Sequence, residues 1–394
     1  MNEKRSKGRF FIHKGLYFAP VMLLCDWQFY GKAVKMNLEK EMSEEQKSVL
    51  LNSNDVDAVI ITDPYNMRYI SAFAGEGCLY VSKNRKVLIT DSRYTEVAGK
   101  TSSFDIVEEG RGSGIKSRYE TLNECISSDS AKRIGYEDNA MICSQFDEFK
   151  KELEVKEFVP LGDSVSKMRR VKKPWEKEYL AKAESIGDAA FEDVLKVIHP
   201  GMTEIEAAAE LEYAMRKNGG QGLSFETIMA SGIHSSMPHA VPSDKVMEKG
   251  DFVTMDFGCM YNGYCSDMTR TIVFGKAADW QKEIYGIVLD ANNAVIEKAH
   301  GGMTGIEIDA IARDIIKEAG YGKCFGHSLG HGIGLQIHED PNCTQKDDRS
   351  IEAGMVESDE PGIYIPGKGG VRVEDMVMMA PAWQRPEDLI RESA

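Results

Sequence analysis

Residues 250–258 read GDFVTMDFG, and residues 354–362 read GMVESDEPG. Each stretch begins and ends with glycine and carries an acid at the same position, so Asp256 matches Glu360. Further towards the N-terminus, Gly201-Met202-Thr203 matches Gly302-Met303-Thr304 in the same way. The second half of the chain therefore contains an internal repeat, and this repeat decides the fold of that half.

Each copy of the repeat predicts two helices joined by a Gly-Met-Thr turn. Thr203 and Thr304 are natural N-caps, and a glutamate three residues later completes a capping box in both copies. A histidine-bearing loop and two acids in or near strands follow each time, with Asp267 falling near Glu374. Two such halves related by a pseudo-twofold axis would bring these polar side chains to one central site.

The polar residues of the repeat form a set with metal-binding chemistry. Four carboxylates and one imidazole suit a pair of divalent ions, such as Mn²⁺, Co²⁺ or Zn²⁺. Two such metals can share a hydroxide, which is a strong nucleophile at neutral pH. Two stretches that carry these acids are predicted to be strands, VTMDFG at 253–258 and VRVED at 371–375. Both are apolar around the acid, where burial is costly without a metal or a partner. The five expected ligands are Asp256, Asp267, His331, Glu360 and Glu374.

Composition narrows the class of protein. The chain has 394 residues and a net charge of −15, which disfavours a nucleic-acid partner because such proteins gather Lys and Arg. Eight cysteines without a CxxC pair indicate reduced thiols and a cytoplasmic location. No apolar run reaches the length of a membrane span, so we expect no membrane partner.

The first half of the chain reads as a separate α/β domain. Short apolar runs at 57–62, 78–81, 86–90 and 133–137 predict strands, and residues 91–99 predict a helix. The basic stretch 167–173 before Pro174 predicts the domain junction, and a long helix is expected over 176–199. We therefore expect an N-terminal domain over 36–165 and a catalytic domain over 170–394.

Residues 1–35 form an extension of uncertain role. A helical pattern begins at Met36, which makes Met36 a plausible start of the protein. The basic residues near the N-terminus and the apolar stretch 17–24 faintly resemble an export signal. Leu24 before Cys25 is a poor cleavage residue, and Pro20 interrupts the stretch, so export is disfavoured.

Five motifs in order give a specific resemblance: SFETIMASGIHSSMPHAVP (224–242), GDFVTMDFGCMYNGYCSDMTRT (250–271), GHSLGHGIGLQIHE (326–339), EPGIYIPG (360–367) and GVRVED (370–375). They resemble the creatinase/prolidase/methionine aminopeptidase superfamily. DAVIITDPYNMRYISAF (57–73) and ITDSRYTEVA (89–98) are similar to its N-terminal domain. The resemblance implies a creatinase-like α/β domain followed by a pita-bread catalytic domain, and a homodimer.

The resemblance also implies roles for single residues. Asp256 and Glu374 resemble bridging ligands, and Asp267 a bidentate ligand. Glu360 resembles a ligand that also accepts a proton, and His331 the single imidazole ligand. Four further residues are implied to act on substrate or beside the acids: His239 on the scissile peptide, His338 on the tetrahedral intermediate, Arg372 as a partner of the acids, and His327, which could touch substrate or only fix its loop. His234 is interpreted as structural.

The implied activity is cleavage between a residue and a following proline, with Mn²⁺ as the most plausible metal. Overall resemblance favours an Xaa-Pro aminopeptidase over an Xaa-Pro dipeptidase, and no physical feature of the sequence separates them. Intact ligands disfavour a creatinase-type hydrolase and a non-enzymatic binding protein. Glu357 and Asp359 depart from the apolar residues usual beside Glu360, and we expect them to need solvent or basic partners.

Overall fold

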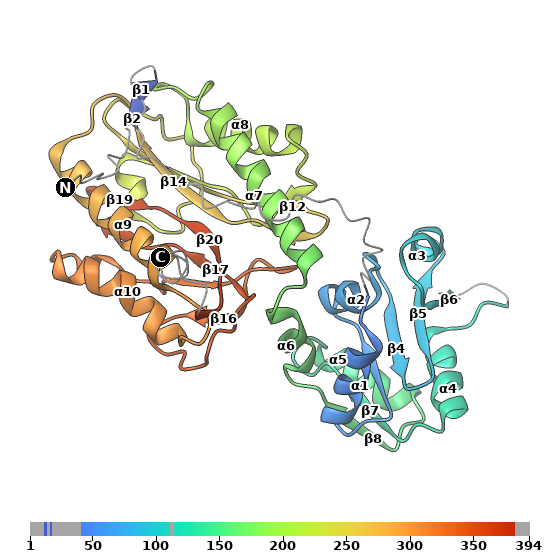
Figure 1. Cartoon of the computed structure of the whole chain (residues 1–394). Helices are drawn as coiled ribbons and strands as arrows, with labels where there is room; N and C mark the ends of the chain where they lie inside the picture. The colour runs from blue at the N-terminus through green and yellow to red at the C-terminus, as the bar shows by residue number, and fades with distance from the viewer. Residues whose placement is uncertain (1–11, 14–15, 18–40, 111–113, 383–394) are drawn as a thin grey trace, which may run out of the picture. The chain divides into compact units, whose positions relative to one another are not determined.

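The computed structural model describes residues 12–13, 16–17, 41–110 and 114–382. These residues form two compact units, which divide between Arg169 and Arg170 (Figure 1). The predictions for the extension 1–35 fall largely outside the described residues, and so does the start of the helical pattern at residues 36–40. The described helix in this region begins at Glu44. Among the described helices, none combines the length and the apolar character needed to cross a membrane.

The N-terminal unit is a six-stranded mixed sheet with helices. The strand order is β6-β5-β4-β3-β7-β8, in which β3 runs antiparallel to β4 and parallel to β7. The strands are β3 Ala58–Ile61, β4 Cys78–Ser82, β5 Lys86–Asp91, β6 Asp105–Glu109, β7 Arg133–Tyr136 and β8 Glu157–Pro160. The helices are α1 Glu44–Ser53, α2 Pro64–Ser71, α3 Thr95–Thr101, α4 Arg118–Asp129, α5 Cys143–Glu152 and α6 Ser164–Arg170.

The expected strands of this unit are present, and the expected helix at 91–99 begins later. β3 is apolar and buried along its whole length, which fits a central strand. The helix begins at Thr95 because Asp91 holds the preceding turn: its carboxylate accepts from the backbone N–H of Arg93 at 2.9 Å.

The C-terminal unit places two helix pairs outside a set of small sheets (Figure 1). The pairs are α7 Pro174–Val194 with α8 Glu204–Lys217, and α9 Asp279–Lys298 with α10 Gly305–Glu318. Both capping boxes predicted by the repeat are confirmed, at Thr203 with Glu206 and at Thr304 with Glu307. The prediction that α7 reaches residue 199 is wrong, because the chain tightens into a turn after Val194, where the N–H of Val197 bonds the carbonyl of Val194 at 2.9 Å.

The strands of this unit also follow the repeat. One sheet has the order β10-β11-β14, and the other has the order β16-β15-β17-β20. Their bounds are β10 Ile228–Ser231, β11 Phe252–Phe257, β14 Met268–Val273, β15 Gly330–Gly332, β16 Glu339–Cys343, β17 Val356–Asp359 and β20 Asp375–Met378. The remaining strands are β1 Ile12–His13, β2 Leu16–Tyr17, β9 Gly222–Leu223, β12 Cys259–Tyr261, β13 Tyr264–Cys265, β18 Gly362–Ile365 and β19 Gly369–Arg372. In both halves the acids lie in or directly beside an antiparallel pair, β11 with β14 or β17 with β20.

The two halves meet where β14 approaches the segment between β19 and β20. The N–H of Glu374 bonds the carbonyl of Thr269 at 3.1 Å, and the hydroxyl of Thr271 bonds the carbonyl of Arg372 at 2.8 Å. The expectation that 371–375 is one strand is therefore wrong. Glu374 lies in the break between β19 and β20, because its backbone pairs across to the other half of the repeat.

Each half has its own apolar core. One core includes Ile186, Leu211 and Phe257, and the other includes Ile284, Ile308 and Val371. Glu357 and Asp359 are also buried, each 1% exposed. We expected these acids to need solvent or basic partners, and their burial excludes solvent as the partner. Asn292 donates to the Asp359 carboxylate at 3.1 Å, and the charge of Lys172 acts on Glu357.

Candidate metal centre

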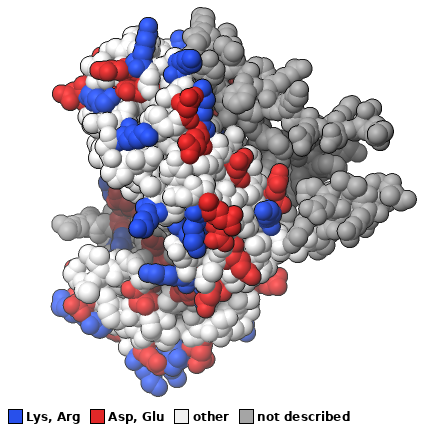
Figure 2. Space-filling model, turned by 90° about the vertical axis from the view of Figure 1, so that its left-hand side faces the viewer, with Lys and Arg blue, Asp and Glu red and all other residues white. Residues whose placement is uncertain are grey.

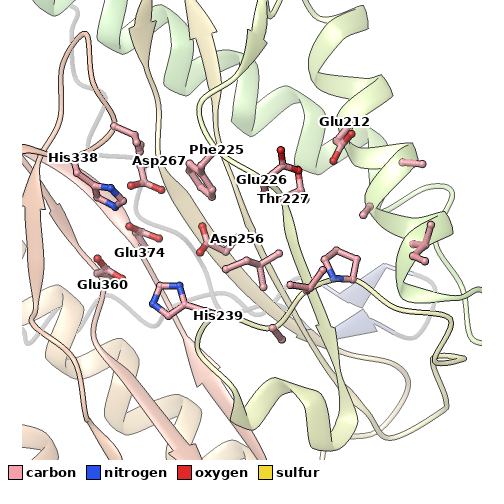
Figure 3. Close-up of a pocket in the computed structure, with 18 of the residues that line it drawn as sticks. Glu212, Phe225, Glu226, Thr227, His239, Asp256, Asp267, His338, Glu360 and Glu374 are labelled. Atoms are coloured by element: carbon pink, nitrogen blue, oxygen red, sulfur yellow. The ribbon is translucent and has the colours of Figure 1, made fainter. Parts of the chain in front are cut away.

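Three buried carboxylates converge between the two halves of the C-terminal unit (Figure 3). Asp256 lies in β11, Asp267 directly precedes β14, and Glu374 directly precedes β20. One carboxylate oxygen from each of the three lies within 4.8 Å of the other two. Strands far apart in the chain therefore deliver their acids to one point.

Two further side chains complete the set of five predicted ligands. His331 lies in β15, and Glu360 follows β17 directly. The Nε2 of His331 is 3.4 Å from an oxygen of Asp267 and 3.7 Å from an oxygen of Glu360. The structure thus brings all five residues together, with two from the first half of the repeat and three from the second.

Hydrogen bonds from surrounding side chains orient these acids. Thr269 donates to Glu374 at 2.6 Å, and Ser358 donates to Glu360 at 3.3 Å. Arg372 donates to one oxygen of Asp256, while its Nε donates to the hydroxyl of Thr269 at 2.9 Å. Such contacts fix the direction in which a ligand presents its oxygens.

Burial and mutual repulsion dominate the electrostatics of the acids. Burial, and then the charges of Glu374 and Asp256, raise the pKa of Asp267 well above its usual range. Burial, and then the charge of Glu360, raise the pKa of Glu374 in the same way. Burial also raises the pKa of Glu360 to about 7. Four acids this close are costly unless protons or cations neutralise them.

The histidine of the set is suited to bind a cation as a neutral ring. Burial, and then the charge of neighbouring His338, lower the pKa of His331 to about 4. The ring nitrogen Nδ1 faces the carbonyl of Gly332 at 3.1 Å, which leaves Nε2 directed at the acids. A neutral imidazole fixed through its other nitrogen is a common form of metal ligand.

The residues therefore fit divalent metal ions. Asp256 is buried, and its second oxygen, Oδ1, has no hydrogen-bond partner in the described structure. Oxygen ligands with one imidazole suit Mn²⁺, Co²⁺ or Zn²⁺. Bound there, such ions would supply a lowered pKa for a water molecule and polarisation of a carbonyl.

The predicted substrate residues fall into two groups. His239 and His338 line the same cleft as the five ligands, and the rings of His338 and His331 meet edge to face at 4.3 Å. His327 and Arg372 are not part of the lining. His327 faces the hydroxyl of Tyr364 at 2.9 Å and the carbonyl of Ser328 at 2.8 Å, so these contacts of its ring are within the protein.

His234 has the structural surroundings that the sequence analysis assigned to it. Its Nδ1 lies 3.1 Å from Glu204, a fully buried residue on α8. Glu204 also accepts from the backbone N–H of Ser231 at 2.7 Å and from the hydroxyl of Ser243 at 2.7 Å. This network fixes both ends of the loop that carries His239.

Two residues of the site were missed by the sequence analysis. Thr269 follows Asp267 by two positions, so the alternation of a strand could have placed both on one face. Tyr364 accepts from Arg372 at 2.8 Å and contacts His327. Its position depends on how β18 packs, and no local sequence signal indicates it.

The cleft at the site has a volume of about 590 Å³ and extends from the acids towards α8 (Figure 3). Among the described residues that line it there is no lysine or arginine. On the outer face shown in Figure 2, lysine and arginine are interspersed with acids among the described residues, without a continuous basic area. A cleft of this size can hold a short peptide.

Comparison with known proteins gives two family matches and close relatives. Residues 178–381 match metallopeptidase family M24, and residues 46–171 match the creatinase/prolidase N-terminal domain. An Xaa-Pro dipeptidase from Pyrococcus furiosus is 41% identical over 331 residues, which cover 84% of this chain and 92% of that protein.

Solved structures agree with these matches. An Xaa-Pro dipeptidase from Bacillus anthracis superposes with a TM-score of 0.81 at 42% identity, covering 85% of this chain and 94% of that one. An X-Pro aminopeptidase from Thermotoga maritima superposes with a TM-score of 0.80 at 38% identity, covering 84% and 95%. The predicted fold, a creatinase-like α/β domain followed by a pita-bread domain, is confirmed.

Proposed function

Because the chain belongs to metallopeptidase family M24, we propose that it is a metal-dependent peptidase that hydrolyses the bond between a residue and a following proline. The observation that carries this proposal is the convergence of Asp256, Asp267 and Glu374 with His331 and Glu360 on one cleft. All five predicted ligands are present and buried or nearly so. This supports an enzyme over a binding protein of the same fold.

Two divalent ions, with Mn²⁺ as the first choice, would be held by these five residues and would supply an activated water and a polarised carbonyl. Glu360 would accept the proton of the attacking water, since its carboxylate lines the cleft beside the other predicted ligands, 3.7 Å from the Nε2 of His331. His239 and His338 line the cleft beside the acids, where they can donate hydrogen bonds to the scissile peptide and to the developing oxyanion. Burial raises the pKa of Asp256, and the charge and the hydrogen bond of Arg372 oppose this shift and orient the carboxylate.

Substrate length divides the proposal into two candidates. The relatives from P. furiosus and B. anthracis are named Xaa-Pro dipeptidases, and at 41% and 42% identity they are closer to this chain than the T. maritima relative at 38%. We therefore place the dipeptidase first, ahead of the aminopeptidase that the sequence resemblance favoured. The T. maritima relative, named an X-Pro aminopeptidase, supports the second candidate. A homodimer in the cytoplasm remains our expectation from the sequence.

A substrate panel tests both candidates. The purified chain, loaded with Mn²⁺, is offered Ala-Pro, Gly-Pro, a tripeptide with proline second, a longer Xaa-Pro peptide, and creatine. We expect hydrolysis before proline, with the dipeptides fastest. Faster cleavage of the longer peptides would make the chain an aminopeptidase. Hydrolysis of creatine alone, or a failure to hydrolyse any of the peptides, would contradict the proposed function.

A further inference from the structure

The cleft continues past the predicted metal ligands in the direction of α8. We call this part the α8 arm and define it by Ile205, Ala208, Glu212, Glu226, Thr227 and Val241. Figure 3 shows Glu212, Glu226 and Thr227 on the α8 side of the pocket, away from Glu360 and Glu374. None of these residues belongs to the predicted ligands or the predicted catalytic histidines.

The α8 arm combines an apolar wall with two acids. Ile205, Ala208 and Val241 offer apolar surface, and Ile205 and Val241 are exposed. Glu212 and Glu226 supply two carboxylates, with no lysine or arginine among the described residues that line the cleft to neutralise them. A ligand group with an alkyl stem and a positive head matches this pattern, because the stem packs on apolar surface while the head meets the acids.

A third observation indicates that the arm is built to receive a ligand. Thr227 is 4% exposed, and its hydroxyl has no hydrogen-bond partner within the described structure. A buried hydroxyl without a partner is unfavourable in the free protein. An amine or amide group of a bound peptide would satisfy it.

The charge of the arm decides which end of a substrate it can take. A free dipeptide ends in a carboxylate beside the proline, and two glutamates would repel that group. The residue on the other side of the scissile bond carries the α-ammonium group and a side chain that can itself be basic. The arm therefore suits the residue that precedes proline.

We propose that the α8 arm binds the side chain of the residue before proline and selects lysine or arginine there through Glu212 and Glu226. This inference rests on the proposed function and refines its substrate class. Ion pairs in a partly open cleft are modest, so we expect lysine to be preferred over an uncharged residue of equal length by about fivefold. Salt should reduce this preference, because it screens exposed charges.

The test compares two substrates that differ in one charge. The values of kcat/KM are measured for Lys-Pro and norleucine-Pro with Mn²⁺ present, at low and at high ionic strength. If longer peptides prove faster in the substrate panel, the same pair of N-terminal residues is placed on that longer scaffold. We expect a ratio of about five at low salt and a lower ratio at high salt.

The glutamates are then tested by isosteric replacement. E212Q and E226Q should each lower the ratio, and the double variant should bring it close to one. E210Q, which removes a charge from the same helix outside the cleft, is the matched control and should keep the wild-type ratio.

A ratio near one in the wild-type chain, or an unchanged ratio in the double variant, would overturn this inference while leaving the proposed function in place. If neither the lysine nor the norleucine substrate is hydrolysed, either as a dipeptide or as a longer peptide, the proposed function and the inference are both overturned.

Discussion

The two halves of the repeat share a frame but treat the same buried positions differently. In the first half, the two alternate positions before Asp256 are Val253 and Met255, and both are fully buried. In the second half, the matching positions before Glu360 are Glu357 and Asp359, each 1% exposed. The two buried positions beside the predicted ligand are thus apolar in one half and acidic in the other.

The difference shows that the backbone arrangement shared by the two halves places the acid at the site. The residues beside the acid do not determine its position. Burial raises the pKa of Glu357 and of Asp359 well above the usual range. One oxygen of each has no hydrogen-bond partner in the described structure. The second half tolerates them through neighbours outside its own strand, with Lys172 acting on Glu357 and Asn292 donating to Asp359.

The largest expected effect follows from removing one ligand in each half. Asp267→Asn and Glu374→Gln should each lower kcat/KM on the order of 10³-fold or more, because several kcal/mol of charge stabilisation are lost with a metal. Steady-state kinetics with metal analysis measures this, and Asp290→Asn on the surface of α9 is the control. If one of the two variants kept near-normal activity, its half of the repeat would not be part of the site.

The next effect concerns the buried charges that distinguish the halves. Lys172→Met should destabilise the folded state by about 1–3 kcal/mol, because Glu339 loses its ion pair with Lys172 and Glu357 loses a nearby cation. The double variant Lys172→Met/Glu357→Val copies the apolar first half and should recover part of the loss. Urea denaturation of both variants measures this, with the surface change Lys249→Met as control. A double variant that is less stable than Lys172→Met would contradict the idea that Lys172 compensates for the buried carboxyl group of Glu357.

A smaller effect separates the two histidines that the repeat places in loosely equivalent loops. His239→Ala should lower kcat by about 10²-fold while metal content stays constant, since His239 lines the cleft but is not a predicted ligand. His331→Ala should weaken metal binding, and high Mn²⁺ should restore part of its activity. The assignment is wrong if His239→Ala loses metal while His331→Ala keeps two ions per chain.

The smallest effect tests one of the hydrogen bonds between the halves at the site. Thr269 of the first half donates to Glu374 of the second, and loss of such a hydrogen bond typically weakens a metal site about 10-fold or more. Thr269→Val should therefore raise the Mn²⁺ concentration needed for half-maximal activity by about 10-fold. Thr254→Val is the control, because its hydroxyl pairs with Thr271 and not with a ligand. Equal behaviour of the two variants would argue against the positioning role of Thr269.

Most of the fold and the grouping of the five predicted ligands could be predicted from the sequence, because the repeat fixes both the helix caps and the order of the acids. Prediction from the sequence failed where tertiary packing decides the outcome. Glu374 leaves its strand because it pairs with Thr269 in the other half. Glu357 and Asp359 are buried by neighbours distant in the chain, and Tyr364 reaches Arg372 only through the packing of β18. None of these contacts has a local sequence signature.

We propose that both halves of the repeat together hold a pair of metal ions that the peptidase reaction needs. The most direct measurement is a calorimetric titration of Mn²⁺ into chelator-treated protein, with hydrolysis of Ala-Pro and of a longer Xaa-Pro peptide followed at each point. We expect no activity without metal, binding of two ions per chain, and activity that rises as the sites fill. Full activity in the chelator-treated protein, or no binding of Mn²⁺, would contradict this proposal.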